Sequence, residues 1–292
     1  MKTKRNIKKY ILILLNLITI ILLGITTISC SPSSSKEIIN KDNLFIVHYI
    51  DVGQGDSILI QVNDKNMLID AGPKSNKDDI INYLNSQKIE KLDYVIATHP
   101  HEDHIGNMAD IIKKYTIVNF YAPKVTHTSK IFENMIDALK EKDMKIKVIR
   151  EGTNTINLGE NTNVSVYAPV SNKYDDLNNY SPIIKISYKN NSFLFTGDAE
   201  KLSEDEVLNK SYNLKADVLK VGHHGSSSST SNNFLKEVTP SIAVIMVGND
   251  NDYGHPNKET LNSLKNKNIK IYRTDLDKTI ILYSDGNNVI KY

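Results

Sequence analysis

The sequence predicts an α/β fold in which two mixed β-sheets are covered by helices. Two observations favour this class. Strand-like runs joined by short turns open and close the chain after residue 43, as in antiparallel hairpins. Between them, apolar strands alternate with helical segments, which adds parallel strands and helical layers. An open doubly wound sheet is the alternative, and it fits the hairpin-rich beginning and end less well.

The first half of the chain contains strands, then helices and strands in alternation. Gly53 and Gly55 permit a tight turn between the first two strands. Runs rich in β-branched and aromatic residues predict strands, and segments with helical periodicity predict helices. The expected strands are 44–52, 57–62, 66–72, 92–99, 116–123 and 144–149, and the expected helices are 76–88, 107–115 and 131–143.

The second half repeats this organisation. Apolar runs again predict strands, and two polar segments with helical periodicity lie between them. The expected strands are 164–169, 182–189, 192–198, 216–224, 241–247, 270–274 and 279–284, and the expected helices are 204–212 and 258–266. We find no repeat of the solenoid type, so residues 44–292 are expected to form a single domain.

The first 43 residues predict an export signal and a tether. Residues 1–10 carry five basic side chains and no acidic one, and residues 11–29 are mostly apolar. Cys30 follows "TTIS", which resembles the lipobox of bacterial lipoproteins. We therefore expect a signal peptide over 1–29, lipidation of Cys30 and a Ser-rich tether over 30–43. An uncleaved membrane anchor is the alternative, because about 19 apolar residues can span a bilayer.

Either interpretation leaves the basic end inside and places the domain on the outer face of the cytoplasmic membrane. Because Cys30 is the only cysteine, a disulfide or a cysteine nucleophile in the domain is excluded. Residues 30–292 carry 31 basic and 34 acidic side chains, a net charge of −3. This charge makes strong non-specific binding to nucleic acid a poor expectation.

The stretch "ATHPHEDHIGN" is the strongest chemical signal in the sequence. It follows an apolar strand and holds His99, His101, Asp103 and His104 within six residues. In extended backbone, residues two apart point the same way, so His99 and His101 can share one ion. Asp103 and His104 can then face a second ion. Imidazole and carboxylate together suit Zn²⁺, Mn²⁺ or iron, so the motif predicts a metal site rather than a solvated loop.

The motifs resemble those of the metallo-β-lactamase superfamily, over about residues 44–285. The resemblance implies a four-layer αββα sandwich. It also implies that Asp70 in "LIDAG" supports a ligand, that Asp198 in "FLFTGD" bridges two metal ions, and that one histidine of "GHHG" binds the second ion. Strand periodicity leaves His223 and His224 open, and the residue nearer the loop, His224, is favoured.

A closer resemblance is to the metallo-hydrolase domain of the ComEC competence proteins. It rests on "HYIDVGQGDSILIQ", "THPHEDHIGN", "LKVGHHGSS" and "YGHPN", which occur in the same order. Those proteins also carry a transmembrane channel region, which this chain lacks, so no channel function is expected here. The resemblance implies nucleic acid or another phosphodiester as substrate. No obligate protein partner is inferred.

The chain departs from the superfamily at the third metal-binding motif. No histidine lies between His127 and His223, and "NNYS" stands where a ligand is expected. The resemblance then implies Asp103, His104, Asp198 and His224 for one ion, and His99, His101 and Asp198 together with water molecules for the other. Such an oxygen-rich site shifts the expectation towards Mn²⁺ without excluding Zn²⁺. Asn179 and Ser181 of "NNYS" are candidates for holding water or substrate.

Four further polar residues have two interpretations each. His255 in "YGHPN" is a candidate phosphate contact or general acid, or else a surface turn residue. Ser226 is a candidate phosphate contact, or else part of a Ser-rich loop that leads into a helix cap. Gln54 and Asp56 in the "GQGD" turn are candidate supports for the metal ligands, or else ordinary residues of a hairpin turn.

Together these features predict an exported, metal-dependent hydrolase that acts on phosphodiester bonds through two metal ions and a water that they activate. Asp103 would orient the nucleophile as well as bind metal. A related alternative is an esterase for cell-wall or lipid head-group phosphodiesters. A different class of function is a non-catalytic lipoprotein that binds DNA or a polymer. Hydrolysis of β-lactams is disfavoured by the missing third histidine.

Overall fold

The computed structural model describes residues 43–249 and 251–292. Contacts within the chain group residues 41–292 into one compact unit. The predicted signal peptide (1–29), the lipidated Cys30 and the tether up to residue 42 lie outside the described residues, so these expectations stay predictions. In the part of the chain that is described, every helix is too short or too polar to cross a membrane.

The first sheet is mixed and is built around an antiparallel hairpin. Strand β1 (Phe45–Tyr49) pairs with β2 (Ile58–Val62), and Tyr49 lies opposite Ile58. Asn63 and Asp64, with φ of 49° and 57°, form the turn of the hairpin that joins β2 to β3 (Lys65–Ile69). Positive φ at both turn residues suits the right-handed twist of the hairpin. The sheet order is β14-β13-β1-β2-β3-β4-β5-β6. Its strands are β1 (Phe45–Tyr49), β2 (Ile58–Val62), β3 (Lys65–Ile69), β4 (Lys91–Ile96), β5 (Thr116–Ala122), β6 (Ile146–Val148), β13 (Ile280–Ser284) and β14 (Val289–Lys291).

The second sheet joins an antiparallel half to a parallel half. Strands β7, β8 and β9 pair antiparallel, whereas β9, β10, β11 and β12 pair parallel. Its order is β12-β11-β10-β9-β8-β7. The strands are β7 (Thr162–Val166), β8 (Ile184–Tyr188), β9 (Asn191–Phe195), β10 (Val218–Lys220), β11 (Ile242–Ile245) and β12 (Lys270–Arg273).

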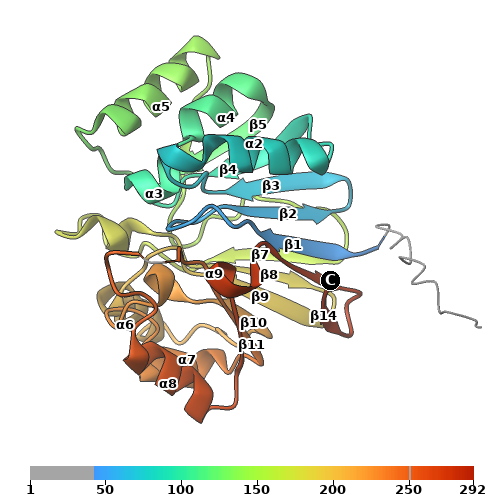
Figure 1. The fold of residues 1–292 in the computed structure, drawn as a ribbon, viewed down its shortest axis with the longest axis vertical. Coiled ribbons are helices and arrows are strands. Elements are labelled where there is room, and N and C mark those ends of the chain that lie inside the picture. Colours follow the sequence, from blue (N-terminus) through green and yellow to red (C-terminus); the bar gives the residue numbers. More distant parts are fainter. Residues whose placement is uncertain (1–42, 250) are drawn as a thin grey trace, which may run out of the picture. The chain divides into compact units, whose positions relative to one another are not determined.

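Helices cover the outer face of each sheet (Figure 1). One set lies on the first sheet: α2 (Lys77–Ser86), α3 (Glu102–Ile105), α4 (Met108–Lys114) and α5 (Lys130–Glu141). The other set lies on the second sheet: α6 (Lys201–Leu208), α7 (Asn232–Val238) and α8 (Lys258–Asn266). Short helical turns complete the chain: η1 (Lys74–Asn76), η2 (Leu177–Tyr180), η3 (Gly222–Gly225) and α9 (Thr274–Asp277).

Three separate hydrophobic clusters match the interfaces between four layers. The largest lies between the sheets and includes Tyr49, Phe193 and Phe195. A second joins the first sheet to its helices, and a third joins the second sheet to its helices. The expected αββα sandwich is therefore confirmed.

Several predicted strands extend past the observed ends, and the strand before "GHHG" is one of them. The expected strand 216–224 ends at Lys220, because His223 and His224 have left-handed backbones with φ of 46° and 53°. Helix α7 lies directly after the Ser-rich segment and is capped by Ser231, whose Oγ accepts a hydrogen bond from the backbone N–H of Phe234. Neither α7 nor β14 is among the expected elements, although one interpretation of Ser226 placed a helix cap at the end of the Ser-rich loop.

Candidate metal centre

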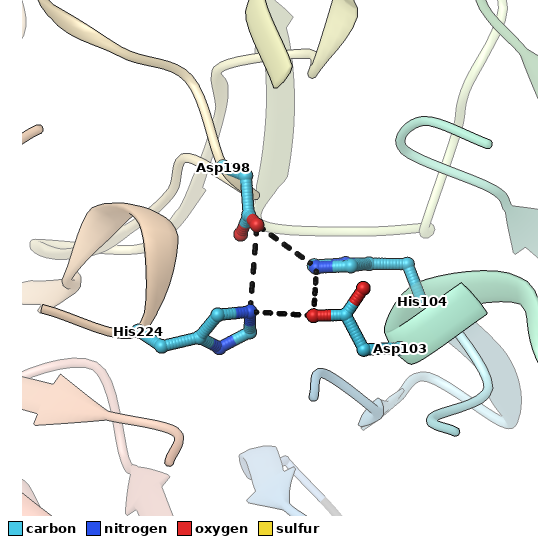
Figure 2. A group of neighbouring side chains, drawn as sticks. All are labelled: Asp103, His104, Asp198 and His224. Atoms are coloured by element: carbon cyan, nitrogen blue, oxygen red, sulfur yellow. Dashed lines mark hydrogen bonds and ion pairs between the residues drawn. The ribbon is translucent and has the colours of Figure 1, made fainter. Parts of the chain in front are cut away.

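Four predicted metal ligands meet at the ends of three strands. Asp103 and His104 follow β4, Asp198 follows β9 and His224 follows β10 (Figure 2). His104 Nε2 lies 3.1 Å from Asp198 Oδ2, and His224 Nε2 lies 3.1 Å from Asp103 Oδ2 and 3.4 Å from Asp198 Oδ2. One ligand atom from each of the four residues lies within 4.8 Å of all the others. This spacing fits a single divalent ion.

Hydrogen bonds orient both histidines of this group. Nδ1–H of His104 donates to Asp70 Oδ2 at 2.8 Å, and Nδ1–H of His224 donates to the carbonyl oxygen of Met246 at 2.9 Å. Each bond leaves Nε2 facing the centre with a free electron pair when the ring is neutral. Metal-binding histidines in proteins are held in this way.

The charges of the group also favour a bound cation. Burial alone would lower the pKa of His224, but the carboxylates of Asp198, Asp103 and Asp56 together outweigh burial and raise it to about 10. Likewise, burial lowers the pKa of His104, but Asp198, Asp103 and Asp70 together outweigh it and raise this pKa well above its usual range. Burial raises the pKa of Asp198, and His104 and His224 more than reverse this effect. In the metal-free chain two protonated histidines therefore balance the carboxylates of Asp103 and Asp198, and a divalent cation would replace these two protons.

His99 and His101 lie beside this group. His99 Nε2 is 3.0 Å from His101 Nδ1 and 3.9 Å from Asp198 Oδ2. Burial, followed by the charge of His104, lowers the pKa of His99 well below its usual range, so the ring is neutral at neutral pH. Neither histidine belongs to a group of three or more metal-binding side chains among the described residues.

Ser181 takes the place where a third histidine was expected. Its fully buried Oγ lies 3.2 Å from His99 Nδ1 and accepts a hydrogen bond from the backbone N–H of Asp198 at 3.1 Å. Asn179 is also buried, and its Oδ1 accepts from the backbone N–H groups of Glu200 and Ser203. Both side chains thus contact protein groups that surround the ligands, and a role in holding water or substrate stays a prediction.

The two histidines of "GHHG" do not point to opposite faces of a strand. The left-handed turn brings His223 Nε2 to 3.8 Å from Asp198 Oδ2, while His223 Nδ1 lies 3.3 Å from Glu200 Oε1. The His223 ring is 23% exposed, whereas His224 is buried within the group of four. This placement favours His224 as the ligand and leaves His223 at the edge of the cleft.

The "GQGD" turn contributes two residues to the surroundings of the centre. Asp56 is buried, and its Oδ1 lies 3.4 Å from His224 Nδ1. Gln54 lines the cleft, and its Oε1 accepts a hydrogen bond from the backbone N–H of Gly248.

Ser226 lies apart from the cleft lining, and its Oγ pairs with Ser228 Oγ at 2.9 Å.

Lys220 is a residue of the site that was not predicted from the sequence. This lysine is 0% exposed, and its ammonium forms an ion pair with Asp56 and lies 3.8 Å from Asp198 Oδ1. The signal was present, because Lys220 stands inside an apolar run that was predicted to be a buried strand. A lysine in such a position needs a buried partner.

A cleft of about 320 Å³ opens onto the centre. Tyr253 is 70% exposed at this cleft, and its ring stacks on that of His255 at 5.7 Å. Burial, followed by the charges of His223 and His224, lowers the pKa of His255 to about 4. His255 is therefore neutral at neutral pH, which suits a hydrogen-bonding contact better than a general acid. The lining residues are Gln54, His101, Glu102, Asp103, Asn178, Asp198, His223, His224, Tyr253 and His255.

Comparison with known proteins shows which family the chain resembles. A model of the metallo-beta-lactamase superfamily matches residues 50–248. The chain is 32% identical to ComE operon protein 3 of Bacillus subtilis over 252 residues, which are 80% of this chain and 32% of that protein. It is 27% identical to competence protein ComA of Neisseria gonorrhoeae over 228 residues, which are 77% of this chain and 30% of that protein. The chain thus spans about a third of the length of these relatives.

Solved structures show the same fold at low sequence identity. The metallo-beta-lactamase fold protein YhfI of Bacillus subtilis has a TM-score of 0.52 at 14% identity, with 85% of this chain and all of that chain covered. Igni18, a metallo hydrolase from Ignicoccus hospitalis, has a TM-score of 0.53 at 16% identity, with 81% of this chain and 98% of that chain covered.

Proposed function

The chain belongs to the metallo-beta-lactamase superfamily, and from this premise we propose that it is a metal-dependent hydrolase that cleaves phosphodiester bonds outside the cytoplasmic membrane. The observation that carries the proposal is the group formed by Asp103, His104, Asp198 and His224. It stands beside a cleft, and its two carboxylates would balance the charge of a divalent ion once both histidines are neutral.

Each residue has a task in this proposal. The Nε2 atoms of His104 and His224 and the carboxylates of Asp103 and Asp198 would hold one divalent ion. His99 and His101 would hold a second ion together with Asp198. Bound ions would lower the pKa of a water molecule towards ~7 and neutralise charge that develops on the substrate oxygens. We propose Mn²⁺ or Zn²⁺, with Mn²⁺ favoured at the position of His99 and His101, where water oxygens would complete the ligands.

Groups of the chain itself would position the substrate. The Asp103 side chain is 29% exposed, so it reaches both the ions and the cleft and can orient a water molecule. His255 and Asn178 face the same space and would donate hydrogen bonds to phosphate oxygens. Tyr253 offers an exposed ring on which a base or another flat group of the substrate can stack.

Nucleic acid is the leading substrate. One relative is called a competence protein and another recombination protein 2, which supports a substrate of this class. The chain matches only a part of each relative, so the proposal concerns cleavage and leaves transport aside.

One observation favours a small phosphodiester as the second candidate. Among the described residues that line the cleft there is no lysine or arginine. Proteins that follow a nucleic-acid backbone neutralise several phosphates with these side chains. A cell-wall or lipid head-group phosphodiester presents one phosphate, which the ions alone could neutralise. A decayed site that only binds a polymer is disfavoured, because the four ligand positions are intact.

Export and anchoring belong to the same proposal. The basic and apolar start of the sequence and Cys30 support a lipoprotein that is tethered to the outer face of the membrane. Labelling with radioactive palmitate in cells, compared between the parent chain and Cys30→Ser, tests this part. Label that persists in the variant would contradict it.

Hydrolysis is tested with the full chain and three substrates: a bis-aryl phosphodiester, single-stranded DNA and RNA, each with Mn²⁺ or Zn²⁺. We expect metal-dependent cleavage that His101→Ala lowers by at least about 100-fold. His127→Ala is the matched control, because His127 lies in the polar loop before α5 and outside the cleft lining. Cleavage of the aryl ester alone would favour the small-substrate candidate. Equal activity of His101→Ala and the parent chain would contradict the proposal.

A further inference from the structure

A fully buried ammonium group lies directly beneath the proposed metal centre. Lys220 is the last residue of β10 and is 0% exposed. Its Nζ forms an ion pair with Asp56, donates a hydrogen bond to the carbonyl oxygen of Gly197 at 2.9 Å, and lies 3.8 Å from Asp198 Oδ1. A buried charge is costly unless it is paired, and here each of these neighbours of the ammonium is an oxygen atom near the ligands.

The contacts of Lys220 connect the segments that carry the ligands. Gly197 directly precedes Asp198, so the hydrogen bond to its carbonyl oxygen holds the turn from which Asp198 projects. On the same segment as Lys220, the helical turn that carries His224 begins two residues later.

Asp56 extends this connection to a third segment. Its backbone N–H donates to the carbonyl oxygen of Asp103 at 3.2 Å, and its Oδ1 lies 3.4 Å from His224 Nδ1. The pair formed by Lys220 and Asp56 therefore reaches the segments of Asp103, Asp198 and His224 at once.

A second group of side chains with the spacing for a metal ion consists of Asp56, Asp70 and His104, and it shares His104 with the first group. The Lys220 ammonium already supplies a positive charge to Asp56 in this group. It does not line the cleft, so it has no direct access to a substrate there. Its effect on chemistry must pass through the ligands.

We propose that Lys220 is a positioning residue of the metal centre. Together with Asp56, it holds the three ligand-bearing segments at the spacing that a metal ion needs. It also acts as a fixed internal cation beside Asp56. This inference rests on the proposed function, because it presupposes that the group of four binds a divalent ion.

The test replaces Lys220 with methionine in the full chain and loads the protein with Co²⁺. The visible absorption of Co²⁺ reports the coordination geometry, and hydrolysis of a bis-aryl phosphodiester gives kcat and KM. We expect Lys220→Met to shift the Co²⁺ bands and to lower kcat about 10–100-fold while KM stays near the parent value. Lys65→Met is the matched control, because it removes a lysine that pairs with Asp93 elsewhere in the first sheet. We expect it to keep the parent spectrum and kcat.

Because Lys220→Met leaves Asp56 unpaired, a second variant accompanies it. Asp56→Asn with Lys220→Met removes both charges and keeps similar side-chain volumes. It should fold and still show the shifted Co²⁺ bands. The inference would be overturned if a folded variant had the same Co²⁺ spectrum and the same kcat as the parent chain. A lower melting temperature of that variant would not rescue it. Failure of the parent chain to bind Co²⁺ would instead overturn the proposed function, and the inference with it.

Discussion

At the scale of single residues, the proposed metal site depends on the hydrogen bonds that orient the ligands as well as on the ligands themselves. Asp70 accepts from His104 Nδ1 at 2.8 Å and also from the backbone N–H and the hydroxyl of Thr98. These bonds fix the His104 ring so that Nε2 faces the centre. Such partners of metal-binding histidines contribute strongly to metal affinity.

We therefore expect Asp70→Asn to weaken metal binding about 10–100-fold, because the amide no longer favours Nδ1–H on His104. Isothermal titration of Mn²⁺ or Zn²⁺ into metal-free protein measures this change. The variant keeps the side-chain shape, and circular dichroism checks its fold. An unchanged Kd in a folded Asp70→Asn variant would show that Asp70 does not orient the ligand.

The raised pKa of His224 predicts how metal-free protein responds to pH. In the folded chain this pKa is about 10, against 6.5 for an ordinary histidine. The stability that protonated His224 contributes is fully present below pH 6.5 and is lost as the pH rises through about 10. The melting temperature of EDTA-treated protein should thus fall over this range. A melting temperature that stays level in metal-free protein from pH 6.5 to 10 would contradict this expectation.

Part of the site could be predicted from residue types alone. His99, His101, Asp103 and His104 are neighbours in the sequence, so their clustering needs no knowledge of the fold. The roles of Lys220 and Ser181 could not be predicted in this way. Lys220 meets Asp56 across 164 positions of sequence, and Ser181 meets His99 across 82. Such contacts arise only when the two sheets pack together.

At the scale of elements, the site depends on how closely two turns approach each other. Gly55 has φ of 149°, and a Cβ atom there would lie 2.3 Å from the carbonyl oxygen of Asp103. The "GQGD" turn can therefore pack against the start of α3 only if this residue is glycine.

Gly55→Ala should displace Asp103 and weaken metal binding as well as lower stability. Gly152→Ala is the matched control, since Gly152 also has a positive φ, of 79°, but no other group lies within 4 Å of the place that an alanine Cβ would occupy. We expect Gly152→Ala to cost about 1–3 kcal/mol of unfolding free energy and to leave metal affinity unchanged. Denaturant unfolding and metal titration of both variants provide the measurements. Equal metal affinity in the two variants would contradict the proposed contact.

Element types were easier to predict than element ends. The strands that open the chain could be located because their apolar and β-branched residues have a clear pattern. The strand before "GHHG" was predicted too long because Val221 and Gly222 continue its apolar run, and only the backbone reveals the left-handed turn that follows. Periodicity also missed α7, because this helix is short and directly follows polar residues.

At the scale of the whole domain, the candidate site connects the two sheets. Asp103 and His104 follow β4 of the first sheet, whereas Asp198 and His224 follow β9 and β10 of the second. The pairing of sheets in an αββα sandwich was implied by family resemblance, since periodicity alone predicted only two sheets and their helices. An ion bound by all four residues would link the sheets.

Removal of the metal should therefore destabilise the domain. An ion present at 1,000 times its Kd stabilises the folded state by about 4 kcal/mol, because it binds folded and not unfolded chain. Melting curves with EDTA, and with excess Mn²⁺ or Zn²⁺, measure the effect. His224→Ala should show a much smaller difference between the two conditions. Equal melting temperatures of the parent chain with and without metal would contradict an ion that is bound by all four residues and links the sheets.

The most direct test of the central claim is the metal content of the purified full chain. Elemental analysis after loading and dialysis should find at least one Mn²⁺ or Zn²⁺ ion per parent chain. The same analysis should find a large loss in Asp198→Asn and no loss in His127→Ala. A parent chain without metal, or an Asp198→Asn variant that retains as much metal as the parent, would contradict the claim that Asp103, His104, Asp198 and His224 form a metal site.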